Sequence, residues 1–295
     1  MKVIVPANIT TFTSNVVENE YPTWATGTTY VAGARVITPS THQVWQSVQP
    51  ANSGKNPVTD DGTWWILVGS TDLYKPFDKK INDRASRNGD MQWTMSLTTQ
   101  ADGLALFGIG AATIRVQITL SGATLYDQTH QVIDTSEVTD WYSFFTYVPA
   151  FETELILTGL PAFAGAQVQV TLSSGGGETS IGEIVLGRVQ TLGITLEGSS
   201  IGMTDYSLKD RDDWGNPLIV ERPFSDTTTF SFAMPPQDGR RVKRILSNLR
   251  ATPAVYFADA DTADFGTTIY GFFADFDIPL THGMSFANLE IEGLV

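Results

Sequence analysis

The sequence of 295 residues contains no cysteine. Disulfides, thiolate metal sites and thiol catalysis are therefore excluded, and so is a small secreted scaffold stabilised by disulfides. Histidine is also scarce: His42, His130 and His282 lie far apart in the sequence, and none has the spacing of a metal site or of a serine nucleophile motif. We therefore expect a protein that is not an enzyme and that carries no catalytic cofactor.

Positive charge is in short supply. Lysine and arginine total 18 against 32 aspartate and glutamate residues, which gives a formal net charge of −14. Binding to nucleic acid depends largely on basic side chains that neutralise phosphates, so neither nucleic acid nor an anionic lipid surface is an expected partner.

Long apolar runs are missing too. No stretch approaches the roughly 20 apolar residues of a membrane-spanning helix. The first apolar run, KVIV, is broken by Pro6 and is shorter than the core of a secretory signal. We expect synthesis in a host cytoplasm without a signal peptide, and no membrane insertion.

The residues that are present favour a folded, mainly β protein. Hydrophobic residues make up 42% and charged residues 17% of the chain, a composition typical of globular domains. Apolar side chains alternate along TIRVQITL (113–120) and AQVQVTLSS (166–174), the period of half-buried antiparallel strands. The glycine-rich SSGGGET (173–179) predicts a connection between two strands.

The spacing of strand and turn signals divides the chain into four parts. We predict an extended N-terminal arm that pairs with a neighbouring subunit (1–20), a small aromatic-rich β module (21–70), a jelly-roll or β-sandwich domain (71–190) and a C-terminal α+β domain with one helix on a sheet (191–295).

The last part contains the one convincing helix pattern, within PQDGRRVKRILSNLRATP (236–253). Its apolar residues recur with the helical period and predict one buried face: Val242, Ile245, Leu246 and Leu249. Basic residues lie mostly off that face: Arg240, Arg241, Lys243, Arg244 and Arg250. Such a charged outer face is usually solvated or paired with carboxylates, and here we expect a subunit contact.

The segment 24–65 has an ordered series of aromatic residues and glycines. The series comprises Trp24, Gly27, Tyr30, Gly33, Val36, Trp45, Asn56, Pro57, Trp64 and Trp65. It resembles the small carbohydrate-binding modules of the chitinase type. The resemblance implies a short twisted sheet that exposes aromatic rings to sugar, and the residues that could supply these rings are Trp24, Tyr30, Trp45, Trp64 and Trp65.

Physical chemistry supports this role independently. A pyranose has an apolar C–H face, and an exposed indole can cover that face while the sugar hydroxyls bond elsewhere. The competing interpretation is that a module this small, with neither disulfide nor metal, needs its large aromatics as a core.

The region after residue 72 resembles the galactose-binding-like β-sandwiches found in phage tail proteins, through LYKPFDKKI (73–81) and MQWTMSL (91–97). The resemblance implies a structural Ca²⁺ near the loop that opens the sandwich. Oxygen ligands of the appropriate kind are Asp78, Asn82, Asp83 and Asp90. A solvated polar loop is the alternative.

The C-terminal part carries YSLKD (206–210), YGFFADFDI (270–278) and LEIEGL (289–294), and resembles minor tail or baseplate proteins of tailed bacteriophages. The resemblance implies a virion location at a tail tip or baseplate and partners among the other tail proteins. A homo-oligomer that adsorbs to host cell-surface polysaccharide is then the expected assembly.

Two alternatives remain open at this stage. The chain could be purely architectural, without sugar binding. It could also be a polysaccharide-degrading enzyme, because a glycosidase requires only two well-separated carboxyl groups. Grouped carboxylates occur twice: Asp210, Asp212 and Asp213, and then Asp259, Asp261 and Asp264.

Overall fold

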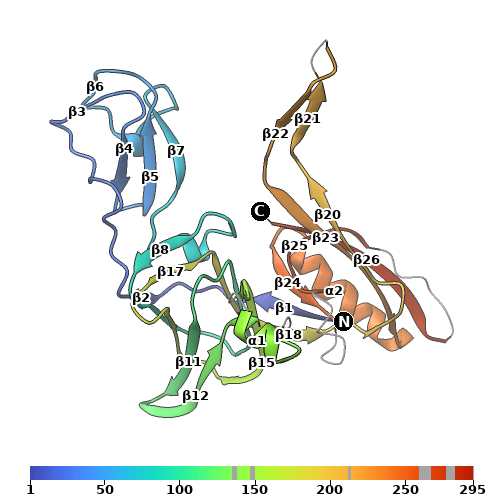
Figure 1. Ribbon diagram of the computed structural model, residues 1–295. Coiled ribbons are helices and arrows are strands. Elements are labelled where there is room, and N and C mark those ends of the chain that lie inside the picture. The colour runs from blue at the N-terminus through green and yellow to red at the C-terminus, as the bar shows by residue number, and fades with distance from the viewer. Residues whose placement is uncertain (135–137, 147–149, 212–213, 259–266, 277–282, 295) are drawn as a thin grey trace.

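The computed structural model describes residues 1–134, 138–146, 150–211, 214–258, 267–276 and 283–294, and it confirms the predicted mainly β class with one main helix. Figure 1 shows the small module (β3–β7) as a separate lobe, the sandwich strands below it, and the C-terminal part with a projecting hairpin.

The strands within the described ranges belong to seven sheets, of which two are large. The first has the order β15-β10-β18-β1-β24-β25-β26-β23-β19, with β20 also pairing to β23. Its strands are β1 (Lys2–Pro6), β10 (Ala101–Phe107), β15 (Glu154–Ala162), β18 (Glu183–Thr191), β19 (Ile194–Thr195), β20 (Ser200–Asp205), β23 (Phe224–Met234), β24 (Ala254–Phe257), β25 (Ile269–Phe276) and β26 (Ser285–Gly293).

The second large sheet has the order β12-β11-β16-β9-β2. Its strands are β2 (Phe12–Ser14), β9 (Met91–Ser96), β11 (Thr113–Leu120), β12 (Ala123–Gln131) and β16 (Gln167–Ser173). Smaller pairs are β8 (Ala85–Asn88) with β17 (Glu178–Ile181), β13 (Ile133–Asp134) with β14 (Ala150–Phe151), and β21 (Leu208–Arg211) with β22 (Pro217–Val220). The predicted connection at 173–179 joins β16 to β17.

The predicted N-terminal arm is the clearest departure from expectation. Residues 2–6 form β1, which pairs with β18 on one side and β24 on the other, inside its own chain. Val3 and Ile4 are both fully buried, as expected of a central strand covered on both faces. Residues 2–6 therefore belong to a sheet that joins the sandwich to the C-terminal part. The prediction that this segment pairs with a neighbouring subunit was wrong.

The second large sheet and the main helix both pack on the same face of the first sheet. Leu186 of β18 packs in the hydrophobic core between the two large sheets, and Val3 of β1 packs in the core between the first sheet and the main helix. Their neighbours Val185 and Ile4 share the core on the opposite face. The register Ile4↔Val189 places these alternating sets on common faces of the sheet.

The main helix is α2 (Gly239–Leu249), preceded by a 3₁₀ turn, η3 (Pro236–Asp238). Val242, Leu246 and Leu249 are buried, as the apolar period predicts. A second, short helix, α1 (Trp141–Thr146), was not predicted, and its four aromatic side chains are exposed.

The first sheet is strongly curled. The ring of Phe107 on β10 stacks on Tyr270 of β25 at 5.6 Å, although three strands separate them. Flat strands lie about 4.8 Å apart, so this contact requires the sheet to bend around its own small core. None of the described helices is long and apolar enough to cross a membrane.

The module is built on the antiparallel sheet β4-β5-β7. These strands are β4 (Arg35–Thr38), β5 (Gln43–Ser47) and β7 (Trp65–Ser70), and a short pair adds β3 (Thr29–Tyr30) and β6 (Asn52–Ser53). The turn η1 (Pro57–Thr59) lies between β6 and β7, and η2 (Lys75–Phe77) follows the module. Buried Val36, Ile37 and Val44 form the centre of the module.

Candidate functional site

Trp65 is the buried core tryptophan of the module, with 1% of its surface exposed. Its indole nitrogen donates to the carbonyl oxygen of Lys55 at 3.0 Å. A sealed ring cannot cover a sugar, so the predicted binding role of Trp65 was wrong. The small module uses this ring for its own stability, as the competing interpretation held.

Tyr30 supports that core. Its ring meets Trp65 edge to face at 5.2 Å, and its hydroxyl accepts a hydrogen bond from the amide of Ala25 at 2.8 Å. The hydroxyl and the ring of Tyr30 both have partners inside the module, so its position is mainly structural.

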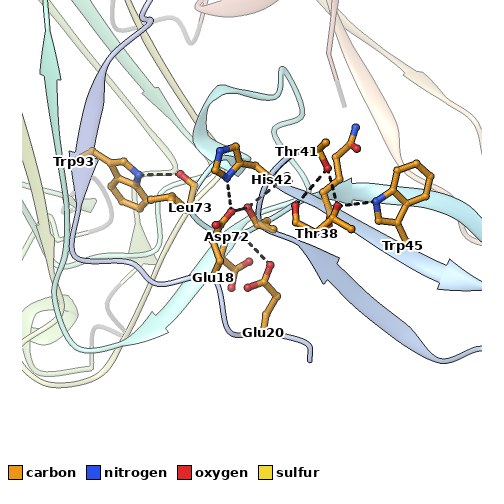
Figure 2. Close-up of polar contacts among 11 residues, drawn as sticks. Glu18, Glu20, Thr38, Thr41, His42, Trp45, Asp72, Leu73 and Trp93 are labelled. Carbon is orange, nitrogen blue, oxygen red and sulfur yellow. Dashed lines mark hydrogen bonds and ion pairs between the residues drawn. The ribbon is translucent and has the colours of Figure 1, made fainter. Parts of the chain in front are cut away.

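Trp45 and Trp64 are half-buried. The indole nitrogen of Trp45 donates to Oγ1 of Thr38 at 3.0 Å, and this contact fixes the ring against the β4 end of the sheet (Figure 2). The ammonium of Lys55 lies 5.4 Å from the ring centroid of Trp64, a cation–π arrangement that covers part of the ring. Both rings retain some exposure, but each has a partner in the module.

The loop before Trp64 is rigidly built. One carboxylate oxygen of Asp60 accepts hydrogen bonds from the amides of Gly62, Trp64 and Trp65. The neighbouring Asp61 binds the side chain and amide of Thr63, and these bonds hold the pKa of Asp61 below its usual value. This loop positions the two tryptophans, and only Trp65 turns into the core.

Trp24 differs from the other four because it lines an open hollow of about 270 Å³. The segment before it runs beside β4: the amide of Ile37 donates to Pro22 at 3.0 Å, and the amide of Trp24 donates to Ile37 at 2.9 Å. The remaining walls come from the end of β4 and from η1. The lining residues are Thr23, Trp24, Ile37, Thr38, Pro39, Ser40, Asn56 and Val58.

The hollow combines an aromatic wall with polar groups. Thr23 and Ser40 are exposed hydroxyl residues, and Asn56 presents an amide whose Oδ1 caps η1 through the amide of Val58 at 3.1 Å. The indole nitrogen of Trp24 is buried and has no hydrogen-bond partner among the described residues. An indole N–H normally finds a partner when buried, so this unsatisfied donor is an exception within the module.

Sequence reasoning identified Trp24 as a candidate binding residue; Asn56 was only a position in the aromatic pattern, and the other lining residues were missed. Thr23, Ser40 and Val58 are common surface residues with no distinctive spacing, and they meet only because β4 and η1 fold together.

A polar junction joins the module to the sandwich (Figure 2). Nδ1 of His42 lies 2.8 Å from Oε1 of Glu18, and the same carboxylate oxygen accepts from the hydroxyl of Thr71. The amide of Thr71 donates back to the carbonyl of His42 at 3.1 Å. The imidazole ring stacks on Tyr74 at 3.8 Å. These contacts fix the base of the module against the segment that leads into the sandwich.

A second acidic residue, Glu20, lies at the same junction and accepts from the amide of Asp72 at 3.3 Å. Burial raises the pKa of Glu20, and the nearby charge of Asp72 adds to this effect. Lys75 pairs with Asp72 at 2.8 Å and with Asp83 at 3.1 Å, so its pKa is raised even though burial alone would lower it.

The four predicted Ca²⁺ ligands do not form one site. Asp83 is engaged by Lys75, Asn82 is exposed, and Asp90 lies in the turn between β8 and β9. Asp78 is half-buried, and its Oδ2 has no partner in the described structure. No group of three acidic or histidine side chains with metal-binding geometry occurs in the described ranges, so the residues do not fit the implied ion.

Among the grouped carboxylates, Asp210 is exposed on β21. Asp212, Asp213, Asp259, Asp261 and Asp264 lie outside the described residues. His42 belongs to the junction, and His130 contacts the hydroxyl of Tyr126 at 3.3 Å on β12. His282 is also outside the described part of the chain.

No protein-family model and no curated protein matches this chain. A comparison with solved structures finds similarity to the crystal structure of the F5/8 type C domain of a Bacteroides fragilis protein. The identity is 12%, the TM-score is 0.29, and the match covers 40% of this chain and 81% of that chain. A likeness at this level is distant, and no functional conclusion rests on it.

Proposed function

We propose that this chain is a non-enzymatic structural component of a phage tail tip or baseplate, and that its module binds host-surface glycan at the hollow beside Trp24. The observation that carries the proposal is the composition of this hollow: one half-buried indole ring and a rim of hydroxyl and amide groups. A saccharide needs both an apolar surface and hydrogen-bonding partners at its edge.

The chemistry of the hollow favours a neutral or weakly charged sugar. Its lining contains neither a basic nor an acidic side chain. A single aromatic contact is worth about 1 kcal/mol beyond area burial, so one module binds weakly. Several copies on one particle would raise the effective concentration and make attachment firm.

The proposed tail location is supported by the resemblance of the motifs at 206–210, 270–278 and 289–294 to minor tail and baseplate proteins. A second support is the projecting ribbon, in which β20 pairs with β23 and β21 pairs with β22; the residues of β20, β21 and β22 are all exposed. A two-stranded ribbon is marginally stable in water by itself, so contacts with other proteins of a larger assembly would stabilise it.

The binding claim is tested on an array of microbial cell-surface polysaccharides and their oligosaccharides, with the whole chain displayed on beads in many copies. We expect retention on at least one glycan, and loss of that retention in Trp24→Ala. The matched control is Trp141→Ala, which removes an exposed tryptophan from α1, outside the module. Equal retention of Trp24→Ala and the wild type, with both folded, would refute the assignment of the hollow.

A purely architectural role is the second candidate, favoured by the exposed ribbon. It predicts no retention on any glycan together with correct incorporation into particles. A hydrolase would instead release reducing ends from a retained polysaccharide, an outcome that contradicts the non-enzymatic assignment.

A further inference from the structure

The C-terminal two-layer unit has opposite charges on its two outer faces. On one side, the outer surface of α2 carries exposed cations and no exposed acid, and we call it the basic helix face. Its members are Arg240, Lys243, Arg244 and, just after the helix, Arg250. None of these four side chains forms an ion pair with a described residue.

On the opposite side, the sheet face is exposed along β26. Burial alternates along β26: Ala287, Leu289 and Ile291 point into the core shared with α2, so the residues between them point away from the helix. Those residues are Phe286, Asn288, Glu290 and Glu292, and all four are exposed. We call this surface the acidic sheet face.

The acidic sheet face continues onto neighbouring strands. Ala233 of β23 pairs with Phe286 on one side and with Ile194 of β19 on the other, so Phe286 and Ile194 lie on the same face with one strand between them. Their side chains are 60% and 61% exposed. The same sheet extends through β20 into the exposed hairpin (Figure 1). The surface therefore combines carboxylates with two exposed apolar side chains.

We infer that the basic helix face of one copy docks on the acidic sheet face of a second copy. The two faces lie on opposite sides of one unit, so the contact joins different surfaces of the partners and repeats from copy to copy. A contact of this type builds rings or filaments. The inference does not depend on sugar binding.

The spacing of the charges suits this arrangement. Arg240 and Arg244 are one helical turn apart, about 6 Å along the axis. Glu290 and Glu292 project from the same face of β26, about 7 Å apart. Two arginines can thus meet two carboxylates side by side, and Arg is the cation best adapted to paired carboxylate contacts.

Charge also explains why a second copy is the favoured occupant. The chain has a net charge of −14, so two copies repel each other in most orientations. Docking on the basic helix face avoids this repulsion, because a positive surface of one copy then contacts a negative surface of the other. The exposed Ile194 and Phe286 lie on the acidic sheet face of that second copy, and docking would shield them from water.

The test uses charge reversal and reconstitution, followed by sedimentation velocity over a range of protein and salt concentrations. We expect the wild type to self-associate more strongly at low salt. We expect R240E/R244E and E290K/E292K each to weaken self-association about tenfold or more, since each variant places like charges opposite one another.

Mixing the two variants provides the decisive arm. The reversed helix of the first variant matches the reversed sheet of the second, and their unchanged faces also match, so the mixture should regain association. The control K80E/R84E makes the same change in net charge as R240E/R244E, at exposed residues of the sandwich loop, and it should associate like the wild type.

Three results would overturn the inference. One is a wild type that is monomeric at every concentration. Another is a mixture of the reversed variants that stays dissociated although both variants are folded by circular dichroism. The third is a basic helix face that binds a probe polyanion, heparin, while the chain itself does not associate; this result would assign the face to an anionic polymer.

Discussion

The imidazole of His42 lies flat against the ring of Tyr74, with centroids 3.8 Å apart and an interplanar angle of 19°. His42 belongs to the turn between β4 and β5, and Tyr74 belongs to the segment that leads into the sandwich. This stacked pair, together with the carboxylate of Glu18, connects the aromatic module to the rest of the protein.

The first expectation concerns this junction. Tyr74→Ala removes the stacking surface for His42 and also an edge contact with Phe12 at 4.9 Å. An aromatic pair contributes about 1 kcal/mol, so the module should stay folded but become less firmly held. Limited proteolysis should cut faster between the module and the sandwich. An unchanged cleavage rate would show that the stack does not fix the module.

The second expectation concerns the core of the module. Trp65→Ala should cost about 3–5 kcal/mol, which is comparable with the whole stability of a unit this small. Hydrogen exchange should report loss of protection in β4, β5 and β7, with the two large sheets unaffected. Trp64→Ala is the matched control and should leave protection nearly intact, because that ring is half-exposed. Similar protection in both variants would contradict the assignment of Trp65 as the core residue.

The third expectation concerns the central strand β1. A Cβ at Gly187 would overlap the backbone carbonyl of Val5 on the paired strand. Gly187→Ala should therefore separate β1 from β18 and destabilise the fold by about 3 kcal/mol. Gly27→Ala is the control, since no atom lies within 4 Å of that added methyl group. If amide exchange in residues 2–5 is equally slow in both variants, the pairing of β1 is wrong.

The fourth expectation concerns pH. Burial, and then the charges of Asp226 and Glu152, raise the pKa of Glu154 from 4.5 to about 7. The folded state therefore holds a proton that the unfolded state has lost. The resulting penalty is absent below pH 4.5, grows between pH 4.5 and 7, and stays at its full value above pH 7.

Glu154→Gln removes this penalty. The variant should match the wild type near pH 4 and be more stable at pH 8 by up to about 3 kcal/mol. Urea unfolding at the two pH values provides the measurement. A variant that is equally or less stable than the wild type at pH 8 would contradict the raised pKa.

The sequence predicted the elements whose pattern is local. The period of 3.6 at Val242 and Leu246 located α2 within a few residues, and the alternation at 113–120 located β11. The role of β1 was missed because a run of three apolar residues does not reveal which strands it will join. The helix α1 was missed because its aromatic residues have no buried face to create a period.

The candidate site shows the same limit. A list of five aromatics could be read from the sequence, but their division into core and surface depends on packing. Trp64 and Trp65 are adjacent, and the same oxygen of Asp60 accepts from both of their amides, so no local signal distinguishes the ring that turns inward. The hollow at Trp24 depends on a parallel bridge between Thr23 and Ile37, which no local pattern records.

The most direct measurement is residue-level footprinting of the tryptophans by hydroxyl radicals, read by mass spectrometry, with and without a saccharide that the chain retains. We expect bound saccharide to lower the labelling of Trp24 and to leave the labelling of Trp141 unchanged. Undiminished labelling of Trp24 at saturating saccharide would contradict this expectation.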